Sequence, residues 1–125
     1  MPQKNQPAIL LVDDEAATRR IITDMLVGSG YRVIEAADAR EALKILRANP
    51  MLFDLLITDL MMPEMKGLDL AGEAETVQPG LKVLYITGDD RSVMAASLQA
   101  SSALLLKPFS QQRLVEEIRQ LLDHS

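Results

Sequence analysis

The sequence of 125 residues has no cysteine, no tryptophan and a single histidine, His124, which is the penultimate residue. Without cysteine the chain has no disulfide, no thiolate metal ligand and no thiol nucleophile. A lone histidine at that position argues against a histidine-ligated zinc site and against a catalytic imidazole. Any chemistry of this chain must therefore be carried by carboxylates, hydroxyls and amines.

Aromatic and basic residues are also scarce. Aromatics make up 3% of the chain, and 13 Lys+Arg against 18 Asp+Glu give a net charge of -5. Stacking platforms and basic stripes, by which proteins hold nucleic acids, are missing, so we expect no direct nucleic-acid binding. No apolar run approaches the roughly 18 residues of a membrane span, and the first residues lack a hydrophobic signal core. We expect a cytoplasmic protein without membrane contact.

The residues that are present suit one soluble α/β domain. Apolar residues make up 48% and charged residues 25%, as in ordinary globular proteins. Five short apolar runs alternate with amphipathic stretches, and they are residues 8–12, 31–36, 55–58, 83–86 and 103–106. Four runs are nearly continuous, as in parallel strands buried on both faces, whereas Arg32 and Glu35 interrupt the second and indicate an edge strand. The alternation predicts a doubly wound (βα)5 domain over residues 8–123, with residues 1–7 as a flexible tail.

Local signals mark where the helices begin. Asp38 followed by Glu41 is typical of a capping box, and Ser110 is placed to cap the last amphipathic stretch. Residues 68–77 predict a weaker helix, because Gly72 inside it costs about 1 kcal/mol relative to alanine. Another helix is expected between the fourth and fifth runs.

Polar side chains follow four of the five runs. Asp13 and Asp14 follow the first, Asp59 the third, Thr87 the fourth and Lys107 the fifth. Taken singly, each has a structural explanation, such as a helix cap, a turn residue or a solvated lysine. Such separate structural roles do not explain why all four strand ends carry polar or charged groups. Since ligands bind beyond the carboxyl ends of parallel strands, this edge is the candidate site.

Three carboxylates at one edge repel one another. At an effective dielectric constant of about 20, one pair about 4 Å apart costs roughly 4 kcal/mol. A hard divalent cation relieves that repulsion, and Mg²⁺ suits oxygen ligands. A carboxylate beside Mg²⁺ and a lysine ammonium can attack phosphorus as a nucleophile.

Four short motifs stand at these strand ends in a fixed order. They are Val12-Asp13-Asp14-Glu15, Asp59-Leu60-Met61-Met62-Pro63 followed by Gly67, Ile86-Thr87-Gly88, and Lys107-Pro108-Phe109. Together they make the chain resemble a response-regulator receiver domain of two-component signalling. The resemblance implies a flavodoxin-like five-stranded parallel sheet of order 2-1-3-4-5. It also implies a phosphoacceptor that receives its phosphoryl group from a sensor histidine kinase or a phosphotransfer protein. Such a domain switches conformation to signal and catalyses only its own phosphorylation and dephosphorylation.

The resemblance also implies a role for each matching residue. Asp59 corresponds to the phosphoacceptor, Lys107 to the lysine that pairs with the phosphoryl oxygens, and Thr87 to the switch hydroxyl. The implied Mg²⁺ ligands are Asp13, Asp14, Asp59 and the backbone carbonyl of Met61, with Asp14 binding directly and Asp13 partly through water. The Lys107-Pro108 peptide bond is usually cis in this family.

The chain departs from the family pattern in the expected fourth helix and fifth strand, the face through which the family usually signals. Leu104 stands where the family often has a tyrosine or phenylalanine, and residues 92–106 contain no charged side chain. We therefore expect that phosphorylation is not read out by a dimer held through salt bridges on this face. The downstream partner stays open, as does the choice between a stand-alone regulator and the receiver part of a hybrid kinase or longer regulator.

Three alternative functions fit parts of the pattern. A flavodoxin-like FMN binder would need a phosphate-cradling loop after the first run, where this chain has acidic residues. An aspartate-nucleophile phosphatase would carry its nucleophile in an Asp-x-Asp arrangement at that same place. A pseudo-receiver would lack the acceptor or the metal ligands, all of which are present here.

Overall fold

The computed structural model describes residues 6–62, 65–88 and 102–123, which form five strands and four helices. The strands are β1 (Ala8–Val12), β2 (Arg32–Ala36), β3 (Leu55–Asp59), β4 (Lys82–Thr87) and β5 (Ser102–Leu106). The helices are α1 (Ala16–Gly28), α2 (Ala39–Ala48), α3 (Gly67–Val77) and α5 (Gln111–Asp123). The helix expected between β4 and β5, and most of the uncharged run, lie outside the described residues.

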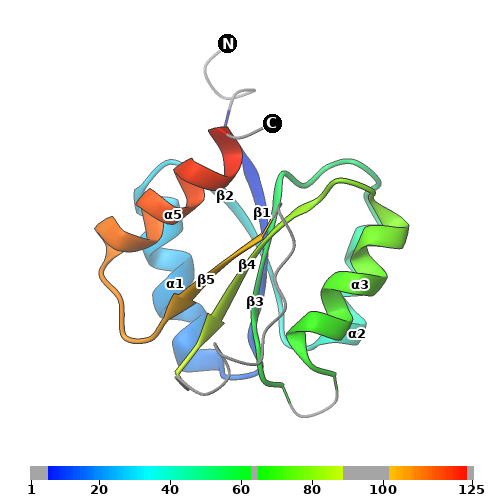
Figure 1. Ribbon diagram of the computed structural model, residues 1–125, viewed down its shortest axis with the longest axis horizontal. Helices are drawn as coiled ribbons and strands as arrows, with labels where there is room; N and C mark the ends of the chain where they lie inside the picture. The colour runs from blue at the N-terminus through cyan, green and yellow to red at the C-terminus, as the bar shows by residue number, and fades with distance from the viewer. Residues whose placement is uncertain (1–5, 63–64, 89–101, 124–125) are drawn as a thin grey trace.

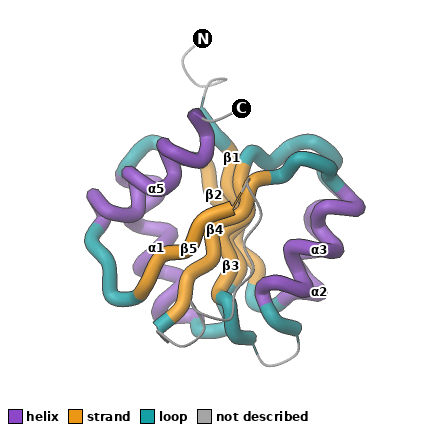
Figure 2. The backbone as a smooth tube through the Cα atoms, in the orientation of Figure 1, coloured by secondary structure: helices purple, strands orange, loops and turns teal. Residues whose placement is uncertain are grey.

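All five strands are parallel and stand in the order β2-β1-β3-β4-β5, which confirms the predicted sheet. Helices α1 and α5 cover one face of the sheet, and α2 and α3 cover the other (Figure 1). The strands form the middle of the three layers (Figure 2). This arrangement brings the carboxyl ends of β1, β3 and β4 to one edge, because neighbouring parallel strands end side by side.

Alternate residues of the central strands pack into two separate hydrophobic cores, one on each face of the sheet. Leu10 of β1 packs in the core under α2 and α3, and its neighbour Leu11 packs in the core under α1 and α5. Every residue of β1 is buried, as the continuous apolar run predicts. Two-sided burial holds β1 and β3 in place, so the residues that follow them start from well-ordered positions.

The last strand differs from expectation. We predicted full burial for residues 103–106, but Ala103 and Leu104 are half-buried and Leu106 is 40% exposed. The reason is its place in the sheet: β5 is an edge strand that pairs with β4. Strand β2 forms the other edge, in agreement with its interrupted apolar pattern.

The predicted helix starts are present. The Asp38 carboxylate accepts a hydrogen bond from the Glu41 amide at 2.8 Å, and the Glu41 carboxylate accepts one from the Ala37 amide at 2.7 Å. Ser110 Oγ accepts from the amide of Arg113 at 3.0 Å ahead of α5. In the described part of the chain, no helix combines the length and apolar character needed to cross a membrane.

Candidate functional site

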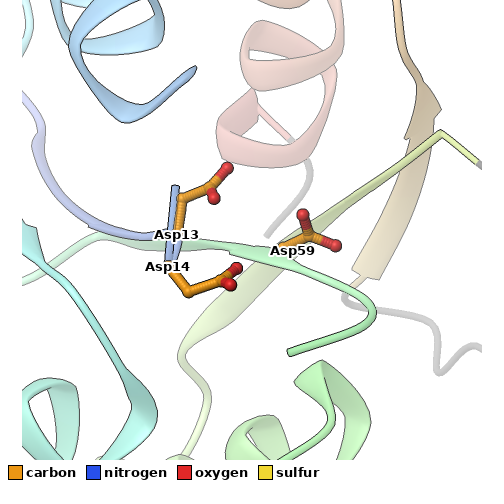
Figure 3. Close-up of side chains that lie close together, drawn as sticks. All are labelled: Asp13, Asp14 and Asp59. Atoms are coloured by element: carbon orange, nitrogen blue, oxygen red, sulfur yellow. The ribbon is translucent and has the colours of Figure 1, made fainter. Parts of the chain in front are cut away.

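Three carboxylates meet at the carboxyl edge of the sheet. Asp13 and Asp14 follow β1, and Asp59 is the last residue of β3. One carboxylate oxygen from each lies within 4.8 Å of the others, and Figure 3 shows the three side chains gathered at the strand ends. Their surroundings differ, because the side chain of Asp13 is only 3% exposed whereas Asp14 is exposed.

Lys107 brings a positive charge to this group. Its Nζ lies 3.1 Å from Asp59 Oδ2, within hydrogen-bond distance, and 3.7 Å from Asp13 Oδ2. Burial lowers the pKa of Lys107, but the hydrogen bond to Asp59 and the nearby negative charges outweigh that effect and raise the pKa overall. Lys107 therefore carries its charge at neutral pH and offsets part of the carboxylate repulsion.

Asp13 is the carboxylate with the least favourable surroundings. Burial is the main cause that raises its pKa, and the charges of Asp59 and Asp14 add to it. Two contacts oppose the rise: the Glu15 amide donates to Asp13 Oδ1 at 2.9 Å, and Lys107 lies nearby. The net effect is that the ionised form of Asp13 costs free energy in the folded protein.

The structure therefore predicts that Asp13→Asn stabilises the protein without metal. Asparagine keeps an acceptor for the Glu15 amide and removes the buried charge, so we expect a gain on the order of 1 kcal/mol, or about 4 °C in Tm, at neutral pH in EDTA. A raised pKa in the folded state means that stability falls as pH rises from 3.8 through that raised value. The gain should therefore shrink as pH is lowered toward 3.8.

Thermal melts of the parent, Asp13→Asn and Asp14→Asn in EDTA check this prediction. Asp14 is exposed, so its substitution should have the smaller effect. Mg²⁺ at millimolar concentrations should stabilise the parent by mass action. A parent whose Tm ignores Mg²⁺, or an Asp13→Asn variant that melts lower in EDTA, would contradict the electrostatic account.

The backbone around Asp59 is held closely. Asp59 Oδ1 accepts a hydrogen bond from the Met61 amide at 3.0 Å, and the Gly67 amide donates to the Leu60 carbonyl at 2.9 Å. A Cβ atom added at Gly67 would stand 2.4 Å from the Asp59 carbonyl oxygen. Only a glycine permits the first turn of α3 to approach Asp59 so closely.

Gly67→Ala should accordingly displace Asp59 and destabilise the protein by about 1–3 kcal/mol, the usual cost of overpacking. Gly72, on an exposed position of the same helix, is the matched control, because a Cβ there meets nothing within 4 Å. Gly72→Ala should instead stabilise by about 0.5–1 kcal/mol through helix propensity. Urea unfolding of both variants measures the change in the free energy of unfolding. If both substitutions changed it by the same amount in the same direction, the close contact at Gly67 would be ruled out.

The remaining predicted site residues are Thr87 and Met61. Thr87 ends β4 and is buried, and its carbonyl oxygen accepts a hydrogen bond from the Lys107 amide at 2.7 Å. Lys107 is thus positioned through its backbone by the end of the neighbouring strand. Met61 is exposed two residues after Asp59, and the Lys107-Pro108 bond is cis, as the resemblance implies.

One contact of this site was missing from our sequence predictions. Arg19, on the first turns of α1, donates from Nη1 to the main-chain carbonyl of Asp13 at 2.6 Å and from Nε to Glu35 Oε1 at 2.9 Å. No sequence signal links Arg19 to Glu35, because they belong to different elements and meet only when β2 pairs with β1.

The donor set fits a hard divalent cation. Three carboxylates supply close oxygen atoms, and Lys107 compensates only part of their charge. Mg²⁺ binds through a few carboxylates and keeps several waters, which suits a cluster with one exposed and one buried member. The sheet, the acidic cluster and Lys107 together define an α/β domain with a carboxylate site at the carboxyl ends of its parallel strands.

The chain belongs to the response regulator receiver domain family, whose model matches residues 9–119. It is 36% identical over 116 residues to the response regulator receiver protein CpdR of Brucella abortus, covering 91% of this chain and 95% of CpdR. It is also 34% identical to the sensor kinase CckA of Brucella abortus, of which it spans 12%. It spans 28% of the transcriptional regulatory protein GlrR of Escherichia coli, at 35% identity.

Solved structures agree with these sequence relatives. The receiver domain of the hybrid histidine kinase CckA superposes with a TM-score of 0.80 at 35% identity, covering 92% of this chain and 98% of that domain. Receiver domains are signalling phosphoacceptors of two-component systems rather than ordinary enzymes, and they work with histidine kinases or phosphotransfer proteins. They bind Mg²⁺ at an acidic pocket, and an acidic cluster is present here.

Proposed function

We propose that Asp59 accepts a phosphoryl group from the phosphohistidine of a sensor histidine kinase or a phosphotransfer protein, in a reaction that requires Mg²⁺. The observation that carries this proposal is the position of Asp59, 3.1 Å from the Lys107 ammonium and clustered with Asp13 and Asp14. Asp59 is half-buried at the end of β3 and is the carboxylate nearest to the Lys107 ammonium, whereas Asp13 is buried and farther from it.

The transfer exchanges one bond to phosphorus for another. A carboxylate oxygen of Asp59 forms the new O–P bond, the P–N bond of the donor breaks, and its electron pair returns to the imidazole nitrogen, which takes up a proton from solvent. Mg²⁺, when bound, supplies positive charge to the phosphoryl oxygens. In the unphosphorylated protein the Lys107 ammonium donates a hydrogen bond to Asp59 Oδ2. It is therefore placed to pair with a phosphoryl oxygen once the carboxylate becomes an acyl phosphate.

The other residues complete this assignment. Asp13, Asp14, Asp59 and the carbonyl of Met61 are the proposed metal ligands, which the close approach of the three carboxylates supports. The Thr87 hydroxyl is the proposed switch that turns toward the phosphoryl group and transmits the change. The position of Thr87 at the end of β4, beside Lys107, supports that role.

We place the receiver unit at residues 8–123 and its action in the cytoplasm, either as a stand-alone regulator or as part of a hybrid kinase or longer regulator. The family match supports this range of contexts, as do CpdR, of which the match covers 95%, and CckA, of which it covers 12%. The acidic cluster argues against an FMN phosphate at the same edge, because like charges would repel it.

Incubation with acetyl phosphate tests the proposal directly. We expect one phosphoryl adduct per chain by intact mass in the presence of Mg²⁺, located at Asp59 by peptide mapping, and no adduct in EDTA. Phosphotransfer from a panel of phosphorylated histidine kinases then identifies the natural donor. An adduct that forms equally well in EDTA, or that maps to another residue, would refute the assignment.

A further inference from the structure

The guanidinium of Arg19 joins three parts of the protein beside the acidic cluster of Asp13, Asp14 and Asp59. It belongs to α1, it donates to the carbonyl of Asp13 after β1, and it donates to Glu35 on β2. The side chain of Arg19 is 18% exposed and that of Glu35 is 34% exposed, so these hydrogen bonds are partly shielded from water. Partial shielding and the charge of the guanidinium make them costlier to lose than neutral contacts on an open surface.

The carbonyl that Arg19 holds belongs to the peptide unit between Asp13 and Asp14. The orientation of that unit helps to set the directions in which the Asp13 and Asp14 side chains leave the backbone. On the other side of Asp13, its amide donates to the Ala36 carbonyl at 3.2 Å, so both backbone polar groups of Asp13 are bonded to the chain around it. The backbone of Asp13 is thereby held through its amide by the end of β2 and through its carbonyl by Arg19 of α1.

The charge of Arg19 is largely balanced where it stands. Its Nε lies 2.9 Å from a carboxylate oxygen of Glu35, which offsets the positive charge. The contribution of Arg19 to the acidic cluster is therefore geometric, since it delivers two N–H donors in fixed directions. Lysine has the charge but not the planar fork that reaches both acceptors.

We infer that Arg19, oriented by Glu35, is a positioning residue that sets the placement of the Asp13 and Asp14 carboxylates for Mg²⁺. This inference rests on the proposed function, because it assigns Arg19 a part in that same site. Groups that orient metal ligands without touching the metal commonly change metal affinity by about 10- to 100-fold when removed.

The test compares Arg19→Gln, Arg19→Lys and Glu35→Gln with the parent and with Arg20→Gln. Arg20 is the matched control, since it is the next residue on α1, is 76% exposed at its side chain and pairs with Asp24 at 3.6 Å. Two Mg²⁺ titrations are run on each protein: the rate of phosphorylation by acetyl phosphate, and the rise in Tm without any phosphodonor.

We expect Arg19→Gln to need about tenfold more Mg²⁺ for half of either effect. The fold-change in the Mg²⁺ concentration that gives half of the effect should exceed the fold-change in the phosphorylation rate at saturating Mg²⁺. Arg19→Lys should not restore the parent value, Glu35→Gln should shift in the same direction, and Arg20→Gln should match the parent. Arg19 variants that titrate like Arg20→Gln would overturn the inference, and rescue by lysine would overturn its geometric basis.

The two readouts separate this inference from the phosphoacceptor proposal. If the parent is not phosphorylated but Arg19→Gln still shifts the Mg²⁺ dependence of Tm, the phosphoacceptor assignment fails and the positioning role stands. If the parent is phosphorylated and the Arg19 variants need no more Mg²⁺ than the parent, the phosphoacceptor assignment stands and the positioning role fails. Should Arg19→Gln fail to fold, Glu35→Gln decides, because it disturbs the orientation of Arg19 without removing it.

Discussion

Replacing Asp59 with asparagine is expected to abolish the phosphoryl adduct. The amide of asparagine is not a nucleophile toward phosphorus at neutral pH, whereas its oxygen can still accept the hydrogen bond that the Met61 amide gives to Asp59 Oδ1. The local fold should therefore survive while the reaction stops. Intact mass after incubation with acetyl phosphate and Mg²⁺ should show the unmodified chain alone.

The control for this variant is Asp69→Asn, an exposed carboxylate in the first turn of α3 that lies outside the acidic cluster. It should be phosphorylated like the parent. An adduct that persists in Asp59→Asn would mean that a neighbouring carboxylate, Asp13 or Asp14, is the acceptor. Asp59→Asn should change Tm less than Asp13→Asn, because it relieves repulsion but also removes the partner of Lys107.

Lys107→Met is expected to destabilise the protein strongly in the absence of metal. The ammonium lies 3.1 Å from Asp59 and 3.7 Å from Asp13, so its removal leaves a buried carboxylate without a compensating charge. Breaking a buried pair costs about 3–5 kcal/mol, and the partial exposure of Lys107 reduces this to about 2–3 kcal/mol in EDTA at pH 7. Methionine keeps most of the side-chain length, so the loss is mainly electrostatic.

Urea unfolding of Lys107→Met and of Lys44→Met, an exposed lysine on α2, measures the difference. Mg²⁺ should recover part of the lost stability, as should acid, because each removes uncompensated negative charge. The raised pKa of Lys107 gives a further check: its contribution in the parent is complete below pH 10.5 and is lost as pH rises through the folded value. Equal stability of the two variants in EDTA would show that the carboxylates do not depend on Lys107.

Particular residues show how far sequence patterns reach. The run at 8–12 predicted a strand buried on both faces, and β1 is one, because side-chain alternation in a strand is local and burial follows from the pattern. Asp38 and Ser110 predicted helix starts for the same reason, since a cap bonds amides three residues away. The placement of Asp13, Asp14, Asp59 and Lys107 together followed from strand ends meeting at one edge.

Other features depended on neighbours that are distant along the chain. The apolar run at 103–106 predicted full burial, yet Leu106 is exposed because β5 lies at the edge of the sheet. Gly67 belonged to a recognised motif, but only the packing of α3 against Asp59 shows why a side chain cannot stand there.

The sequence by itself determined the fold class, the strand ends that carry chemistry and the charges available there, since these follow from periodicity and residue type. The tertiary structure decided which carboxylate is buried, which one Lys107 holds, and that Arg19 reaches Asp13 while bonded to Glu35. The physical reason is that burial, pKa and hydrogen-bond distance depend on atoms that pairing of the strands and packing of the helices bring together. No local pattern along the chain records those distances.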